Sequence, residues 1–387
     1  MSHDPLALES IVALAADLVR IPSVSPTIAP EEAHGEQAVA SFAVEWLEAR
    51  GIKAWLEEAA PGRPNAVAEI VGGEGPTLVL CAHLDTVGTA TMTIPPFEPT
   101  VKDGRLYGRG SYDMKGAAAC CMVAAASLHD SGFAGRLMLA LVADEEHASL
   151  GAADFVRRHR ADACVLTEAS AGDLVLAHKG FVWAEIVTRG RAAHGSRWDL
   201  GVSAIGKMGR IIAALERFDR DTLRSRTHSL VGPASMHCAL VEGGAGLSTY
   251  APECRLKIER RTLPGETPAV VLEELRQVVR EAGEEATVTS LLDRAPLTCP
   301  SDSPIARCVR DAAATVTGAI PPDCGVSYWM DAAIFAGAGI PTVNIGPDGA
   351  GAHEDVEWVD VASLMTCART LSECGRTFAR YSLSTVR

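Results

Sequence analysis

The stretch "VLCAHLDTVGT", Val79 to Thr89, decides the fold of this chain of 387 residues. In it an apolar run leads into His83 and Asp85, with Leu84 between them. An apolar run of this kind is typical of a strand buried on both faces of a parallel sheet. Such sheets place their binding sites beyond the carboxyl ends of their strands. The stretch therefore predicts a buried strand that delivers His83 and Asp85 to a crevice.

Helical and strand patterns alternate around this stretch. Helical patterns occur in the first twenty residues and over 31–51 and 114–132, and apolar strand patterns over 65–73, 136–147 and 162–168. Strands that alternate with helices are typical of a mostly parallel sheet with helices on both faces. The first half of the chain is therefore predicted to belong to an α/β domain.

The pattern changes near residue 180. From there to about residue 290 the order is strand, helix, strand, strand, helix, strand. This is the split β-α-β pattern of a small ferredoxin-like α+β domain. A helix over "SPIARCVRDAAATVTG" and a strand over "PTVNIGP" then resume the first pattern. We therefore expect residues 1–179 and 291–387 to form one domain, into which residues 180–290 are inserted.

Composition and charge limit the possible partners. The net charge is −14, from 35 Lys and Arg against 49 Asp and Glu, so neither nucleic acid nor an anionic membrane is expected as a partner. No apolar run reaches the roughly 18 residues of a membrane-spanning helix, and the N-terminal stretch lacks the pattern of a signal peptide. A cytoplasmic protein is expected. Its eleven cysteines are expected to be reduced, buried thiols rather than metal ligands or nucleophiles.

Acidic and imidazole side chains recur at predicted strand ends and tight loops. They are His83, Asp113, Glu145, Glu146, Glu168 and His353. Each alone has a simpler explanation: a hydrogen-bonded histidine, solvated glutamates, or an aspartate that caps a helix. Together they form a ligand set suited to zinc, or to manganese or cobalt.

Five of these residues suffice for two metals if one carboxylate bridges the ions. Asp113, in the glycine-rich segment "GRGSYDMKG", is the best bridging candidate. A two-metal hydrolase also needs a general base, which one of the adjacent glutamates can supply. Neighbours in an extended segment point apart, so Glu146 is expected to bind metal while Glu145 faces the water. Asp85 is expected to accept the far N–H of His83 and to fix its tautomer.

A wider set of motifs carries a resemblance. "CAHLDTV", "YGRGSYDMKG", "DEEHASLGA", "RAAHGS", "ERRTLPGE" and "GIPTVNIGPDGAGAHEDVEW" follow one another along nearly the whole chain. In order and spacing they resemble the co-catalytic zinc deacylases and peptidases. That group includes acetylornithine deacetylase, succinyl-diaminopimelate desuccinylase, aminoacylase and carboxypeptidase G.

The resemblance implies roles for single residues. His83, Asp113 and Glu168 match the ligands of one metal. Asp113, Glu146 and His353 match the ligands of the other metal, and Glu145 matches the general base. The bridging aspartate of the family is commonly followed by a cis peptide bond, so a cis Asp113–Met114 bond is expected.

The inserted domain also acquires a role through the resemblance. His194 matches a histidine that, in the family, reaches across a dimer to the substrate carbonyl, and Arg261 matches an arginine that holds a substrate carboxylate. Residues 180–290 are thus expected to dimerise and to close over the site as a lid. The simpler alternative for His194 is a turn residue whose ring is satisfied locally.

Two segments depart from the family pattern. The family often has an asparagine in a Gly-Gly segment where this chain reads "GGAGLSTYAP". Ser248 takes that place when counted from Gly244, and Thr249 when counted back from Pro252. After His194 the chain reads "GSRWDLG", which lacks the usual proline and carries the bulky Trp198. The first departure alters a pocket contact of the family, and the second indicates a shifted substrate class.

The function expected is metal-dependent hydrolysis of the amide bond of an N-acyl amino acid by a homodimer. The cofactors expected are two divalent metals, with zinc first and cobalt or manganese as alternatives. The nearest alternative is a dipeptidase or carboxypeptidase that uses the same two-metal site on a short peptide. A non-catalytic binding protein is the rival from another class, and the presence of all five ligands and the base argues against it.

Overall fold

The computed structural model describes residues 5–382, which divide into two compact units. The first unit comprises the described residues up to 176, residues 299–324 and those from 330 onward, and the second comprises residues 177–298 and 325–329. Inside the second unit, Trp329 donates a hydrogen bond to the Ala295 carbonyl (3.0 Å) and packs edge-on against Phe181. These contacts explain why residues 325–329 belong there, although the sequence placed them in the last segment of the large domain.

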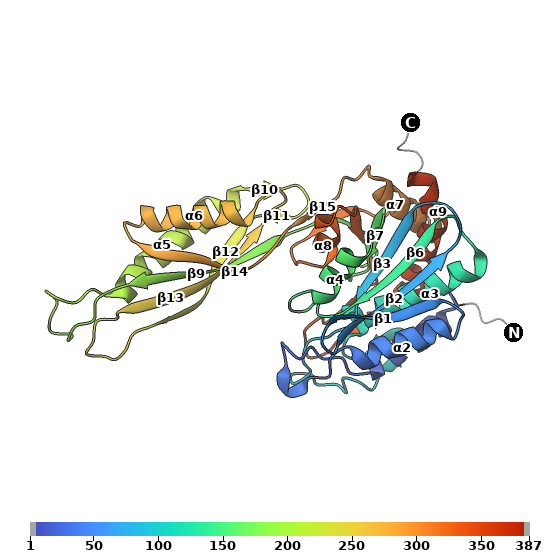
Figure 1. Cartoon of the computed structure of the whole chain (residues 1–387), viewed down its shortest axis with the longest axis horizontal. Coiled ribbons are helices and arrows are strands. Elements are labelled where there is room, and N and C mark those ends of the chain that lie inside the picture. Colours follow the sequence, from blue (N-terminus) through green and yellow to red (C-terminus); the bar gives the residue numbers. More distant parts are fainter. Residues whose placement is uncertain (1–4, 383–387) are drawn as a thin grey trace. The chain divides into compact units, whose positions relative to one another are not determined.

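A mixed sheet lies at the centre of the first unit, with strand order β1-β2-β6-β3-β7-β17-β8. Figure 1 labels its strands β1, β2, β6, β3 and β7. The strands are β1 (Lys53–Ala60), β2 (Arg63–Val71), β3 (Thr77–His83), β6 (Arg136–Val142), β7 (Ala163–Leu166), β8 (Leu174–His178) and β17 (Thr342–Asn344). The central strands β6, β3, β7 and β17 are parallel to one another, which confirms the predicted parallel centre. The edges are antiparallel because β1 and β2 form a hairpin and β8 reverses against β17.

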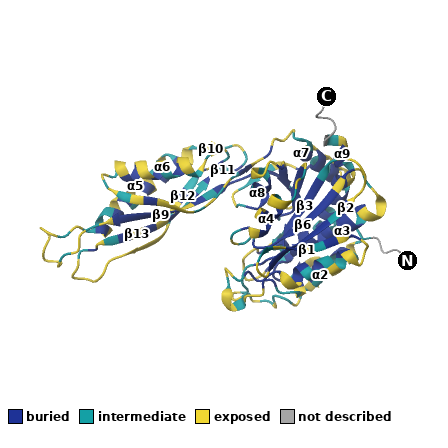
Figure 2. Cartoon of the chain, in the orientation of Figure 1, coloured by how far each residue is buried: buried dark blue, intermediate teal, exposed yellow. Residues whose placement is uncertain are grey.

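Two groups of helices cover this sheet. The first group consists of α1 (Leu8–Arg20), α3 (Gly116–Ser131), α7 (Pro304–Thr317) and α9 (Val361–Ser382). The second group consists of α4 (Leu150–Arg158) and α8 (Ala332–Gly337), which pack together. Helix α2 (Gln37–Glu48) lies against β1 and β2. Helix α3 contacts α1, α9 and strand β3, so nearly all of its alanine-rich surface is buried (Figure 2).

Shorter elements complete the first unit. A small antiparallel sheet has the order β18-β19-β5-β4, formed by β4 (Thr100–Lys102), β5 (Arg105–Tyr107), β18 (Gly349–Ala350) and β19 (Trp358–Asp360). It joins the segment that precedes Asp113 to the segment that follows His353. The other short elements are the 3-10 turn Pro30–Glu32 and the π-type turn Ser111–Lys115.

The second unit has the split β-α-β topology. Its elements are β9 (Gly180–Arg189), α5 (Ala204–Asp221), β12 (Ser235–Gly243), β13 (Glu253–Thr262), α6 (Pro268–Glu281) and β14 (Ala286–Arg294). The sheet order is β12-β13-β9-β14, with every pair antiparallel. Burial alternates along β13 because one face packs under α5 and α6 while the other stays open. A dimerisation or lid role for this unit stays a prediction.

The remaining short elements lie in the second unit or where the chain passes between units. They are the 3-10 turn Leu223–Ser225, β10 (Thr227–His228), β11 (Gly232–Pro233), β15 (Leu297–Thr298) and β16 (Asp323–Val326). All eleven cysteines are free thiols. Among residues 5–382, the structure contains no helix with the length and apolar character required to span a bilayer.

Candidate metal centre

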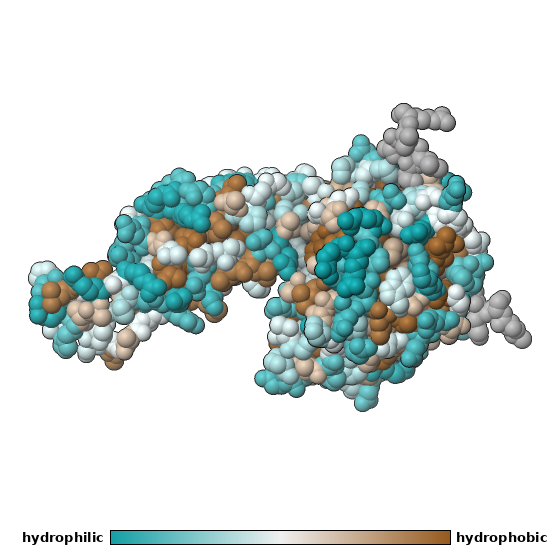
Figure 3. Space-filling view, viewed as in Figure 1, coloured by the Kyte–Doolittle hydropathy of each residue, from teal (hydrophilic) through white to brown (hydrophobic). Residues whose placement is uncertain are grey.

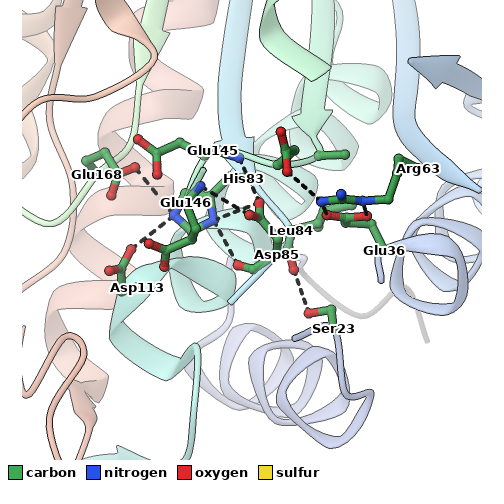
Figure 4. A network of polar contacts seen from close by, with 12 residues as sticks. Ser23, Glu36, Arg63, His83, Leu84, Asp85, Asp113, Glu145, Glu146 and Glu168 are labelled. Atoms are coloured by element: carbon green, nitrogen blue, oxygen red, sulfur yellow. Dashed lines mark hydrogen bonds and ion pairs between the residues drawn. The ribbon is translucent and has the colours of Figure 1, made fainter. Parts of the chain in front are cut away.

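The candidate ligands gather at the carboxyl edge of the parallel strands. Strand β3 ends at His83, where it pairs with Val142 at the end of β6. Glu145 and Glu146 follow β6, and Glu168 follows β7, the other parallel neighbour of β3. The carboxyl ends of adjacent parallel strands meet at one edge, as the sequence predicted. Figure 4 shows these side chains pointing toward one another there.

Asp113 comes from a different part of the fold. It lies in the turn between β5 and α3, directly after the tight segment at Gly110, whose φ is 80°. The Asp113–Met114 peptide bond is cis, as predicted. Figure 4 shows the Asp113 carboxylate beside His83 and Glu146.

The candidate ligands form two groups that share Asp113. The groups are His83, Asp113 and Glu168, and Asp113, Glu146 and His353; within each, the possible ligand atoms lie within 4.8 Å of one another. Oδ1 of Asp113 is 3.0 Å from Nε2 of His83, and Oδ2 is 3.2 Å from Nε2 of His353. One oxygen of the carboxylate thus faces each group, which is the geometry of a bridging ligand.

Other distances define the remainder of each group. Nε2 of His83 lies 3.5 Å from Oε1 of Glu168, and Nε2 of His353 lies 3.0 Å from Oε2 of Glu146. Glu145 belongs to neither group. Figure 4 shows its carboxylate on the side of Glu168, whereas that of Glu146 lies on the side of Asp113.

The structure corrects the contact predicted for Asp85. Nδ1 of His83 lies 2.9 Å from the backbone carbonyl of Asp85, and the nearer carboxylate oxygen is at 3.6 Å. A carbonyl only accepts, so Nδ1 carries a hydrogen, and Nε2 is the nitrogen that faces the cluster and can bind an ion once it has lost its proton. The Asp85 carboxylate instead accepts the backbone N–H groups of Glu145 and Glu146, each at 3.1 Å. Asp85 therefore anchors the turn that carries the two glutamates.

That turn has a second anchor, which the sequence analysis missed. Glu145 and Glu146 lie in a tight turn rather than an extended segment, because Asp144 adopts a left-handed φ of 68°. The buried Arg63 binds Oδ1 of Asp144 at 2.9 Å and forms a two-pronged ion pair with Glu36 (Figure 4). The signals available in the sequence were Asp144, the first acid of the "DEE" run, and Arg63, just before the strand pattern of residues 65–73.

Comparison with known proteins identifies the family. The model of peptidase family M20/M25/M40 matches residues 79–376, which span every candidate ligand. The chain belongs to this family. It is therefore a hydrolase that acts on amide or peptide bonds.

Among relatives of this M20 protein are two acetylornithine deacetylases. The enzyme of Myxococcus xanthus is 32% identical over 343 residues, covering 84% of this chain and 88% of that protein. The enzyme of Proteus mirabilis is 29% identical over 376 residues, covering 92% and 94%.

Solved structures share the fold of this M20 protein. Aminopeptidase PepT from Bacillus cereus superposes with a TM-score of 0.80 at 20% identity, over 96% of this chain and 99% of that one. The YXEP protein of Bacillus subtilis, described as a dinuclear metal-binding peptidase from the M20 family, has a TM-score of 0.74 at 17% identity, over 96% and 98%.

The electrostatics of the M20 site favour a bound cation. Burial raises the pKa of the Glu168 carboxyl to about 8, although His83 opposes the rise. Burial lowers the pKa of His83, but Glu168 and Asp113 raise it by more, to well above its usual value. Hydrogen bonds with Asp113 and Glu146 raise the pKa of His353 to about 10. The carboxylates of the cluster thus favour positive charge at both imidazoles. A divalent ion bound by these carboxylates and imidazoles would supply positive charge in the same place.

Glu145 has the electrostatics of a proton acceptor. Burial, followed by the charge of Glu168, raises the pKa of its carboxyl well above the usual value. A carboxyl shifted in this direction holds a proton more readily than an ordinary glutamate does. The residue is half-buried and lies beside the cluster without belonging to either group of candidate ligands.

His194 and Arg261 belong to the second unit of the M20 chain, whereas the candidate ligands belong to the first. His194 is exposed, and its Nδ1 accepts the backbone N–H of Ser196 at 3.3 Å. Its strand segment bridges Thr249, and Gly195 donates to the Ser248 carbonyl at 2.7 Å. Both candidates for the missing asparagine therefore lie beside the His194 loop. Trp198 in this loop is 81% exposed.

Arg261 lies on the open face of strand β13. Its guanidinium forms an ion pair with Glu259 and is 5.5 Å from the centroid of the Phe181 ring. The neighbouring Arg260 points the opposite way, is buried, and pairs with Glu266 at 2.6 Å. Of the two adjacent arginines, Arg261 is thus the one that faces outward, and Glu259 engages its Nε.

Proposed function

We propose that this protein hydrolyses the amide bond of N-acyl amino acids with two divalent metal ions, for which zinc is the first choice and cobalt or manganese the alternatives. The observation that carries the proposal is Asp113, whose two carboxylate oxygens face two different groups of ligands. His83 and Glu168 would hold one ion, and Glu146 and His353 the other. Bound there, the ions would polarise a carbonyl and lower the pKa of a nearby water toward ~7.

The side chains of the protein supply the remaining steps. Glu145 takes a proton from the attacking water and returns it to the nitrogen of the leaving amine. Asp85 and Asp144 hold the turn on which Glu145 lies, so that its carboxylate is placed beside the ligands without becoming one. Their role is to position the base, not to transfer the proton.

The second unit supplies two further groups in this proposal. Because Nδ1 of His194 accepts the Ser196 N–H, Nε2 carries the hydrogen and can donate it to the oxygen on which negative charge develops. Such a donor contributes a factor of about 10²–10³ to the rate. Arg261 binds the substrate carboxylate through its Nη groups, since Glu259 engages Nε.

A homodimer is part of the proposal. Figure 3 shows apolar surface on the second unit, and the exposed apolar residues of this unit include Trp198, Leu200, Leu240, Val241 and Leu247. A second copy that covers such residues can supply His194 to the first copy's metals. Mixing His194→Ala with Glu145→Gln tests this: part of the activity should return after subunit exchange, whereas zero activity despite proven exchange contradicts a role in trans.

The choice of substrate is tested by steady-state kinetics. The chain is about 30% identical to acetylornithine deacetylases, which favours a deacylase over a dipeptidase or carboxypeptidase. Purified protein should turn over N-acetyl-ornithine or another N-acyl amino acid with a higher kcat/KM than any dipeptide. A higher kcat/KM on dipeptides would make it a peptidase with the same two-metal site.

A further inference from the structure

A buried carboxylate outside the candidate ligands ties two of them together. Glu357 lies four residues after His353 and has no exposed surface. Its Oε1 accepts the backbone N–H groups of Tyr112 (2.9 Å) and Asp113 (3.0 Å). Its Oε2 accepts the N–H of Gly110 (3.0 Å) and Nη1 of Arg109 (2.7 Å). Both oxygens are therefore fully engaged by the loop that ends at Asp113.

Further bonds join the same two segments. Nη2 of the buried Arg109 donates to the Glu354 carbonyl at 3.2 Å, and the N–H of Gly108 donates to the Glu357 carbonyl at 3.1 Å. Just outside these bonds, strands β5 and β19 pair, with Tyr107 opposite Trp358. Hydrogen bonds thus hold the Asp113 loop and the His353 loop together, with Glu357 at the centre of the network.

Simple stabilisation is a weak explanation for this arrangement. A buried arginine–carboxylate pair loses hydration that its attraction often only offsets, so it is poor evidence for stability by itself. Three backbone N–H groups converging on one carboxylate do, however, fix the path of a loop that contains two glycines, at 108 and 110. The engaged groups include the backbone of Asp113 itself.

We propose that Glu357 is a positioning residue that sets Asp113 and His353 at the separation needed to bind the second metal ion. The inference rests on the proposed two-metal function. His83 ends strand β3 and Glu168 follows strand β7 of the main sheet, so neither is held by these bonds to Glu357. Loss of Glu357 should therefore weaken the ion held by Asp113, Glu146 and His353 more than the ion held by His83, Asp113 and Glu168.

The test is stepwise zinc binding to chelator-treated full-length protein, measured by competition with a chromophoric chelator. Wild type should bind two ions. Glu357→Gln keeps the shape but places an amide NH₂ against N–H donors, so one of the two dissociation constants should rise roughly 10–100-fold while the other changes less. Arg109→Lys, which keeps the three backbone bonds, should shift the same constant by a smaller factor and serves if the first variant does not fold.

A matched control separates positioning from general destabilisation. Asp219, in the second unit, is also a buried carboxylate that accepts a backbone N–H, from Met236 at 2.7 Å, and an arginine, Arg224 at 2.9 Å. Asp219→Asn should lower the Tm but leave both dissociation constants unchanged.

The outcomes distinguish the inference from the proposed function. If wild type binds fewer than two ions, the two-metal function fails. If wild type binds two ions and Glu357→Gln and Arg109→Lys bind both as tightly, the positioning role alone is overturned. Equal weakening of both ions, or the same effect in Asp219→Asn, also overturns it.

Discussion

The two groups of candidate ligands have similar chemistry but rest on different parts of the fold. His83 and Glu168 follow neighbouring parallel strands, and their side chains are 1% and 10% exposed. His353 lies in a loop with a left-handed φ of 62°, and its side chain is 55% exposed. A sheet places side chains through its backbone register, whereas a loop needs clamps such as Glu357. We therefore expect the group of His83, Asp113 and Glu168 to bind its ion more tightly, and to exchange it more slowly, than the group that contains His353.

The largest effects should come from removing one imidazole from each group. His83→Ala should abolish activity and the binding of the tighter ion. It should also weaken the binding of the other ion, because Asp113 is shared. His353→Ala should also abolish activity but retain about one ion per chain. Metal content after gel filtration, measured by mass spectrometry, checks both variants.

The control for these variants is His159→Ala. His159 is a half-buried imidazole paired with Glu57 at 3.0 Å, away from the cluster. It should keep both ions and nearly full activity. If His353→Ala loses both ions while His83→Ala keeps one, the order of the two groups is reversed and the comparison is wrong.

Glu145→Gln should have the next largest effect. The change removes the proton acceptor but leaves both groups of ligands intact. We expect kcat to fall by about 10²–10⁴-fold, with a smaller change in KM and with two ions still bound. Loss of an ion from this variant would instead make Glu145 a ligand.

Asp85→Ala should have a smaller effect that reaches both groups. The carboxylate accepts the N–H groups of Glu145 and Glu146 and lies beside His83. Its loss should reduce metal affinity and activity roughly 10–100-fold. Unchanged metal affinity and kcat would show that the turn is held well enough without it.

A further effect is expected on the pH dependence of metal affinity, and it is small for each fraction of a pH unit. The pKa of His353 is raised to about 10 by Asp113 and Glu146, so below that pH its proton must leave before an ion binds. Affinity for the second ion should therefore rise with pH between about 6 and 9, by about tenfold per unit for each proton released. Isothermal titration calorimetry in buffers of different ionisation enthalpy measures these protons. A flat profile would remove His353 from the ligands.

The strand-end residues could be predicted because the apolar runs fix where each strand ends. His83, Glu145, Glu146 and Glu168 lie together for that reason. The partner of His83 was predicted wrongly, since the choice between the carbonyl and the carboxylate of Asp85 depends on the exact turn. Glu357 and Arg109 were missed because 248 positions separate them in the chain. Only the fold shows that a charged residue in "GAHEDVEW" meets one in "GRGSYDMKG".

The most direct test of the central claim is a crystal structure of zinc-loaded Glu145→Gln with anomalous scattering data at the zinc edge. The account predicts two anomalous peaks per chain. One should be coordinated by His83, Asp113 and Glu168, and the other by Asp113, Glu146 and His353, with the side chain at position 145 bound to neither. A single peak, or two peaks without Asp113 between them, would contradict the account.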